Sequence, residues 1–196
     1  MKIQHLIVIA ALLIGGFFAI NDAMRPRPPT VEFIVSGEDA VVIGTTDSYS
    51  YNVISDFTRD NPDVKRLVLQ AMPGTQDVVT NTRLVREIRE AGLATHVPAN
   101  GRIASGAVDW FIAGYPRTIE CGAMIGVHSW GSPLGTRGDR TVYDPQRIAQ
   151  RDFLKDMGVN PDFYEFTRSA AGPDGIHWLS MDEMLRFGLI KHKPDC

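Results

Sequence analysis

The sequence has few cysteines, no strong net charge and no apolar run long enough to be typical of a membrane span. Its 196 residues include two cysteines, 20 Lys and Arg against 23 Asp and Glu, and 44% hydrophobic residues. This composition is that of a globular protein, and it excludes a disordered tail, a collagen-like or low-complexity chain and a polytopic membrane protein. The formal net charge of −3 excludes a globally basic nucleic-acid binder.

Motifs that hold metals are also missing. The sequence contains no CxxC, no HExxH and no cluster of His and Cys, so we expect no metal site and no cofactor. The two cysteines, Cys121 and Cys196, do not define a disulfide framework. Either they pair with each other, or Cys121 is a small buried residue.

The N-terminal segment, residues 1–24, is typical of an export signal. Lys2 and the amino terminus give it a positive start, and residues 6–20 form an apolar or glycine run. Such a run suits a secretory signal, whereas a membrane span usually needs about 20 residues. We therefore predict an exported, periplasmic or otherwise extracytoplasmic protein. The segment is either cleaved or kept as an inner-membrane anchor, the only predicted membrane contact. Residues 25–30 are predicted to be a proline-rich linker before a single domain of residues 31–196.

Hydrophobic periodicity predicts alternating strands and helices after the linker. Strands are predicted at residues 31–35, 40–44, 64–69, 93–97 and 118–127, the first two as a hairpin. Helices are predicted at residues 48–61, 77–91, 105–113, 144–157, 161–170 and 180–187. This alternation is typical of an α/β fold with a largely parallel, buried sheet.

Three segments carry candidate catalytic residues: two lie at expected strand-to-helix junctions and one at the end of an apolar strand. Gly74 and Thr75 form a turn before a helix, and amides at a helix start point toward an anion. Ser105, followed by Gly106, begins another helix. His128 ends an apolar run, and its imidazole can take a proton from a neighbouring hydroxyl. Each also has an ordinary structural explanation: a turn, a helix N-cap and a hydrogen-bonded structural histidine.

Together these segments resemble the Clp/crotonase superfamily, and within it the proteolytic subunit of the Clp protease. Residues 104–107 (Ala-Ser-Gly-Ala) and the apolar helix after them are similar to that subunit's nucleophile segment, and His128 to its base. Residues 73–75 (Pro-Gly-Thr) resemble its Pro-Gly-Gly turn, and residues 179–190 its C-terminal helix and strand. The resemblance spans residues 41–190.

The resemblance implies a spiral of strand–helix units with a mainly parallel sheet, and acyl-transfer chemistry without a cofactor. It gives Ser105 the role of nucleophile and His128 that of general base. The amides of Gly106 and of Thr75 or Gly74 become the oxyanion hole. Thr75 departs from the family's second glycine, and threonine does not readily adopt a positive φ.

The family's third catalytic residue is an Asp, and Ile176 stands at its place here. Asp174, two residues earlier, either reaches the far nitrogen of His128 or is simply a β-turn residue in a Pro-Asp-Gly sequence. Asp109, one helical turn after the serine, is expected to be partnered internally or to mark an exposed stripe. Lys155 would suggest Ser–Lys chemistry, but we expect it on a solvated helix face.

Three functions are compatible with this fold, and only the residues of the site can distinguish between them. We favour an exported serine hydrolase, a peptidase with a peptide or protein substrate and no nucleic-acid partner. The alternatives are a non-catalytic binding or scaffolding protein and a crotonase-type acyl-thioester enzyme. Residues 129–141 are glycine-rich and are expected to form a mobile loop over the site, with Trp130 as cover or anchor. The helices within residues 144–170 lie where relatives build subunit contacts, so we expect a homo-oligomer.

Overall fold

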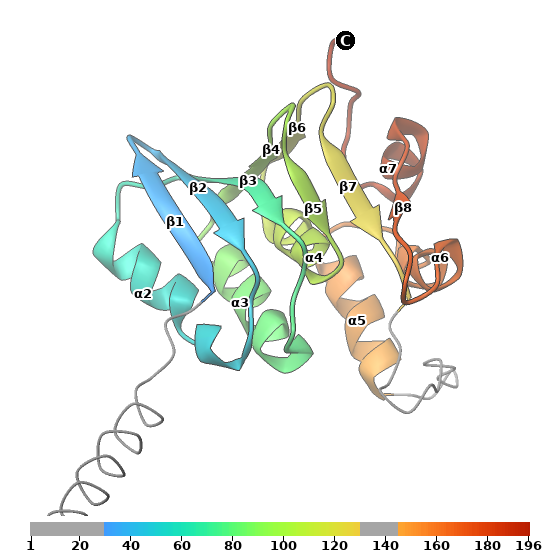
Figure 1. Ribbon diagram of the computed structural model, residues 1–196, viewed down its shortest axis with the longest axis horizontal. Helices are drawn as coiled ribbons and strands as arrows, with labels where there is room; N and C mark the ends of the chain where they lie inside the picture. The colour runs from blue at the N-terminus through green and yellow to red at the C-terminus, as the bar shows by residue number, and fades with distance from the viewer. Residues whose placement is uncertain (1–29, 130–144) are drawn as a thin grey trace, which may run out of the picture.

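The computed structural model describes residues 30–129 and 145–196 (Figure 1). The predicted leader, nearly all of the predicted linker and residues 130–141 of the predicted loop, Trp130 included, lie outside the described residues. Within the two described ranges, every helix is too short or too polar to cross a membrane.

The described residues form an eight-stranded sheet that divides at β3. The strands are β1 (Val31–Ser36), β2 (Asp39–Gly44), β3 (Arg66–Met72), β4 (Ala94–Val97), β5 (Arg102–Ala104), β6 (Arg117–Ile119), β7 (Met124–Val127) and β8 (His177–Trp178). The hairpin of β1 and β2 forms one edge, and β2 runs parallel to β3. The first half of β3 pairs with β4, which leads to β6; the second half pairs with β5, which leads to β7 and the antiparallel β8. The sheet is therefore mainly parallel, as predicted.

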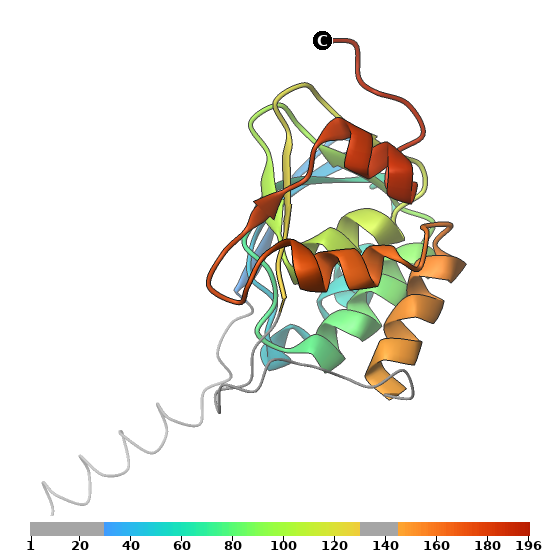
Figure 2. The same cartoon turned by 90° about the vertical axis from the view of Figure 1, so that its right-hand side faces the viewer.

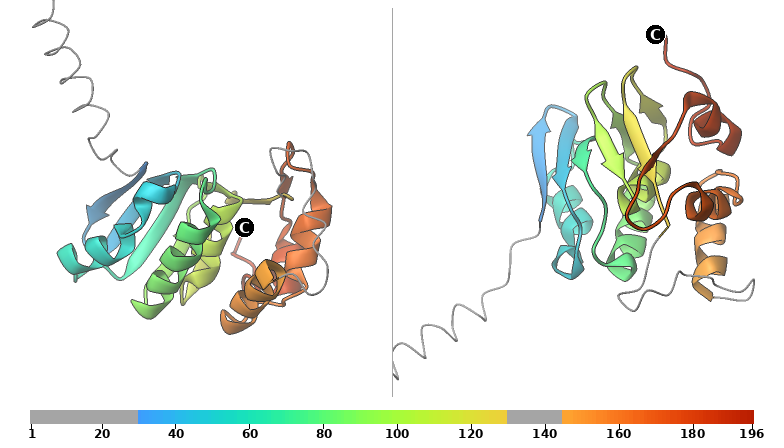
Figure 3. Two further views of the ribbon diagram at one scale, coloured as in Figure 1. Left: turned by 90° about the horizontal axis from the view of Figure 1, so that it is seen from below. Right: turned by 45° about the vertical axis from the view of Figure 1, so that its right-hand side comes forward.

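The helices cover one face of this sheet. They are the 3-10 helix η1 (Ser48–Ser50) and the α-helices α2 (Val53–Asp60), α3 (Val78–Glu90), α4 (Gly106–Ala113), α5 (Pro145–Asp156), α6 (Phe163–Ala170) and α7 (Met181–Phe187). Figure 2 shows the sheet nearly edge-on, with α3, α4, α5 and α6 on the same side of it. Seen from below in Figure 3, α2, α3 and α4 lie in a row, with α5 and α6 beyond them.

Local capping explains where several helices begin. The Asp77 carboxylate accepts hydrogen bonds from the amides of Val79 and Thr80 at the start of α3. Ser180 and Glu183 form a reciprocal capping box at the start of α7. Such caps satisfy amides that have no partner within the helix.

The core lies between the sheet and the helices, and α4 is at its centre. Six of the eight residues of α4 are buried, including Trp110 and Phe111. A helix that is apolar on all sides is stable only when other elements surround it. The start of α4 is therefore held in place by packing, and Asp109 is its only charged residue.

Two predicted elements are divided in the structure. The single strand predicted at residues 118–127 is wrong: β6 and β7 are separate strands that pair with β4 and β5. The chain turns between them at Gly122, whose φ of +95° favours glycine. The helix predicted at residues 48–61 is η1 followed by α2. The strands β5 and β8 were not predicted, because three and two residues are too short to show a period.

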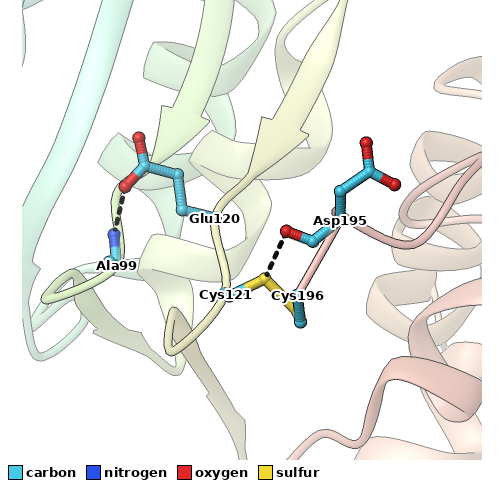
Figure 4. The surroundings of a disulfide bond; sticks show 5 residues. All are labelled: Ala99, Glu120, Cys121, Asp195 and Cys196. Atoms are coloured by element: carbon cyan, nitrogen blue, oxygen red, sulfur yellow. Dashed lines mark hydrogen bonds between the residues drawn. A yellow bond between two sulfur atoms is a disulfide. The ribbon is translucent and has the colours of Figure 1, made fainter.

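Cys121 and Cys196 form a disulfide bond (Figure 4), with their sulfur atoms 2.02 Å apart. Of the two alternatives that the sequence left open, the structure therefore has the pair. The bond joins the turn between β6 and β7 to the last residue of the chain. Beside it, the Glu120 carboxylate accepts a 2.8 Å hydrogen bond from the amide of Ala99.

Candidate active site

The three candidate segments meet because they follow three neighbouring parallel strands. β3 pairs with β5 and β5 with β7, all in the same direction. Their carboxyl ends therefore lie at one edge of the sheet, the place where α/β folds bind ligands. Gly74 and Thr75 follow β3, Ser105 follows β5 and His128 follows β7.

A cavity of about 610 Å³ lies at this edge. Thr75, Ser105, Gly106, His128 and Asp174 all line it, so the structure brings the predicted residues together. Helices α5 and α6 supply much of the opposite wall, through Gln146, Gln150, Leu154, Phe163, Tyr164 and Thr167. The cavity is within the size range of ligand pockets.

Ser105 has an unusual backbone conformation. Its φ of 56° and ψ of −132° make it the only non-glycine residue with positive φ in the described part of the chain. Such a conformation costs about 1–3 kcal/mol and persists only where the surroundings enforce it. Its amide donates a 3.0 Å hydrogen bond to the carbonyl of Gly126. Ser105 is at the N-cap position of α4, but its side chain makes no capping hydrogen bond there.

The sharp turn at Ser105 therefore does not serve to cap the helix. A strained serine between the end of a strand and the start of a helix, in the wall of a cavity, resembles a nucleophile elbow. The structure thus argues against a helix-capping role for its hydroxyl.

Gly74 is packed against Ser105. A β-carbon on Gly74 would lie 2.9 Å from Cβ and 3.3 Å from Oγ of Ser105. The φ of Gly74 is +139°, whereas Thr75 is not among the residues with positive φ. The residue of this turn that has a positive φ is therefore a glycine, and Thr75 is not strained.

The Thr75 amide faces the strand side on which Ser105 lies. Thr46 forms a parallel bridge with Thr75: its amide donates to the Gly74 carbonyl, and its carbonyl accepts from the Gln76 amide. Backbone groups alternate in direction along a strand, so the Thr75 amide points away from Thr46. In residues 30–129 and 145–196, no acceptor is hydrogen-bonded to this amide or to that of Gly106. Two donors are therefore available beside the serine.

Asn81 is a site residue that was not predicted. Its side chain is buried on α3 and donates a 3.0 Å hydrogen bond to the carbonyl of Gly106. Its Oδ1 accepts from the indole of Trp110 at 2.9 Å and from the hydroxyl of Thr46 at 3.3 Å. This network fixes the start of α4 against α3. The available signal was a polar residue on the apolar stripe of the predicted helix.

A backbone carbonyl determines the tautomer of His128. Its Nδ1 lies 2.8 Å from the carbonyl oxygen of Ser129. Because a carbonyl only accepts, Nδ1 carries the proton, and Nε2 of the neutral ring is left as the basic nitrogen. The Ser129 amide donates to the carbonyl of Ala171 at 2.9 Å, which holds this segment against the end of α6. In the part of the chain that the structure describes, no hydrogen bond joins His128 to Ser105.

Asp174 does not contact the far nitrogen of His128 among the described residues. It is exposed, in a β-turn that the Gly175 amide closes by donating to the Gly172 carbonyl at 3.1 Å. The Ser129 carbonyl occupies the nitrogen that Asp174 was expected to reach. Ile176, at the family's Asp position, is exposed and adjoins Gly126 rather than lining the cavity.

Asp109 has the internal partner that the sequence suggested as one alternative. Its Oδ1 accepts a 3.1 Å hydrogen bond from Nε2 of Gln150 on α5, and it lines the cavity. Burial raises the pKa of the Asp109 carboxyl to about 7, because the hydrogen bond only partly offsets the lost hydration. Lys155 is exposed and is not part of the lining. Within the described residues, no group of three His, Cys, Asp or Glu could hold a metal ion.

Comparison with known proteins gives no match at the level of sequence: no protein-family model and no curated protein matches the chain. Solved structures do match. One is a 1510-N membrane-bound stomatin-specific protease, 13% identical, with a TM-score of 0.53 over 81% of this chain and 80% of that one. A variant of that protease in complex with a substrate peptide also has a TM-score of 0.53, with 13% identity over 81% of this chain and 75% of that one.

Enoyl-CoA hydratases match in the same way. The enzyme from Mycobacterium avium subsp. paratuberculosis is 14% identical, with a TM-score of 0.51 over 85% of this chain and 71% of that one. The chain has a Clp/crotonase fold. Both a protease and hydratases share this fold with the chain at low identity. The comparisons therefore do not determine its activity, which has to be inferred from the residues of the site.

Proposed function

We propose that this protein is an exported Clp-protease-like serine hydrolase, a peptidase that uses Ser105 and His128. The observation that carries the proposal is the strained conformation of Ser105 between β5 and α4, with its hydroxyl released from capping. Backbone strain of this kind clusters at active sites.

The reaction follows from the positions around Ser105. Its Oγ attacks the carbonyl carbon of a peptide bond, and its proton passes to Nε2 of His128. The carbonyl oxygen becomes an oxyanion between the amides of Gly106 and Thr75, each worth about 2.7–4 kcal/mol to the transition state. The C–N bond then breaks as His128 returns the proton to the leaving amine. Water, activated by the same histidine, hydrolyses the acyl-enzyme.

The Ser129 carbonyl takes the orienting role that a carboxylate has in a Ser-His-Asp triad. In such triads, replacing the carboxylate by an amide costs about 10⁴-fold in kcat, because the histidine adopts the wrong tautomer. A carbonyl enforces the right tautomer, so this part of the loss is avoided. It carries no full negative charge, so we expect a slower enzyme than a complete triad.

Export is part of the proposal. The apolar run of residues 6–20 suits a signal peptide or an anchor, and the Cys121–Cys196 disulfide suits an oxidising compartment. The substrate would then be an extracytoplasmic peptide or protein, and the enzyme a homo-oligomer. A membrane-bound protease is among the solved structures with this fold, so the fold is compatible with a peptidase.

A non-catalytic binding protein is the second candidate, because no Ser105–His128 hydrogen bond is formed among the described residues. Cleavage of a mixed peptide library by the full chain, with its disulfide intact, separates the two. We expect new peptide termini in mass spectra with the wild type and none with Ser105→Ala. A library left intact by a folded wild type would favour the binding protein.

A further inference from the structure

Asp109 is a charged residue in a place where the fold favours apolar ones. It is the only charged residue of α4, whose other faces are packed in the core. It lies one helical turn beyond Ser105, about 6 Å along the helix axis, and faces the same cavity. Asp109 has no role in the peptidase mechanism proposed above.

The carboxylate of Asp109 is incompletely satisfied. Its Oδ1 accepts from the neutral amide of Gln150, and within residues 30–129 and 145–196 its Oδ2 has no hydrogen-bond donor. Asp109 is partly exposed where it lines the cavity, so its carboxylate can be reached by a ligand. A cation there would add a charge-assisted hydrogen bond to the single neutral one from Gln150.

The surroundings of Asp109 suit an alkyl chain that ends in a positive charge. Val108, Leu154 and Phe163 give the cavity apolar walls, and Gln150 holds the carboxylate in place. In the described part of the lining no lysine or arginine competes for it. Asp174, at the turn, is the other lining carboxylate and is exposed to solvent.

We propose that Asp109 is the base of a specificity subsite that takes the lysine or arginine side chain on the acyl side of the cleaved bond. This inference rests on the proposed function. An acyl carbon on Ser105 Oγ would place the attached side chain beside α4, and an extended lysine or arginine side chain spans about one helical turn. The ammonium or guanidinium group would then meet Oδ2 and keep the carboxylate ionised.

The first test compares peptide diphenyl phosphonates that differ only at the residue next to phosphorus, lysine against norleucine. We expect wild-type protein to be modified about 10- to 100-fold faster by the lysine probe, the range of one charge-assisted hydrogen bond. Asp109→Asn should reduce the ratio of the two rates to about one, while Asp109→Glu and Asp174→Asn should keep it. Equal rates with the wild type would overturn the subsite, whether or not the variants fold.

The second test separates the subsite from catalysis. Calorimetry measures the binding of two product peptides, acetyl-Ala-Ala-Lys and acetyl-Ala-Ala-norleucine, to Ser105→Ala. We expect the lysine peptide to bind about tenfold more tightly, and Asp109→Asn in the same background to remove the difference. If this preference is found but no phosphonate reacts, the subsite stands and the hydrolase proposal fails. Labelling without any lysine preference in either test leaves the hydrolase and overturns the subsite.

Discussion

Gly74 and Ser105 lie so close that a β-carbon on Gly74 would be 2.9 Å from the β-carbon of Ser105. Both residues have positive φ, one as a glycine and the other under strain. This contact joins the turn after β3 to the turn after β5. It therefore sets the position of the serine relative to the amide of Thr75.

We expect Gly74→Ala to lower both the free energy of unfolding and the rate at which a fluorophosphonate modifies Ser105. The new methyl group would clash with Ser105 and would also force alanine into a positive φ, together costing about 2–4 kcal/mol of unfolding free energy. Gly92→Ala is the matched control, since Gly92 also has positive φ but a β-carbon added there would have nothing within 4 Å of it. It should cost about 1 kcal/mol. Equal losses in urea unfolding would contradict a tight Gly74–Ser105 contact.

The backbone strain at Ser105 predicts the order of stability of two variants that lack its hydroxyl. Ser105→Gly and Ser105→Ala both remove the hydroxyl, but only glycine accepts a φ of 56° without strain. We expect Ser105→Gly to be about 1 kcal/mol more stable than Ser105→Ala in urea unfolding. The reverse order would mean that the backbone at Ser105 is unstrained.

Two substitutions test whether His128 acts as the general base and whether Asp174 orients it. We expect His128→Ala to slow the modification of Ser105 by about 10²–10⁴-fold, the usual contribution of a general base. Asp174→Asn should slow it by less than about tenfold, because the Ser129 carbonyl already fixes the tautomer. A loss with Asp174→Asn as large as that with His128→Ala would give the orienting role to the carboxylate.

Stability should fall as pH rises, through Asp109. Its pKa is about 7 in the folded protein against an ordinary value of 3.8. Between these values the folded state holds the proton more firmly, so unfolding free energy decreases from about pH 4 to above pH 7, by about 4 kcal/mol at most. Asp109→Asn cannot ionise and should remove this contribution. An unchanged pH dependence in thermal unfolding of Asp109→Asn would show that another group is responsible.

The sequence predicted those parts of the fold and site that depend on local pattern. The apolar spacing of α3 and the start of a helix at Ser105 could be read directly, whereas the strand that precedes Ser105 was missed. The predicted strand at residues 118–127 was not divided, because the segment that separates its two halves, residues 120–123, is only four residues long. Short strands such as β5 are formed by their neighbours rather than by their own residues.

Contacts between distant segments were beyond a single sequence. Gln150 meets Asp109 across 41 positions, a contact that no local pattern encodes. The partner of His128 is a backbone carbonyl, and every residue has one, so nothing in the sequence marks Ser129 for this role. The Asp174 expectation came from the family pattern, whereas the geometry depends on how α6 ends near Ala171.

The central claim is that Ser105 is an activated nucleophile, and fluorophosphonate labelling of the purified full chain tests it most directly. We expect one adduct on the wild type by intact mass, located on Ser105 by peptide mapping. The adduct should be absent from Ser105→Ala and slowed by about 10²–10⁴-fold in His128→Ala. A folded wild type that acquires no adduct, or one that carries it on another residue, would contradict the claim.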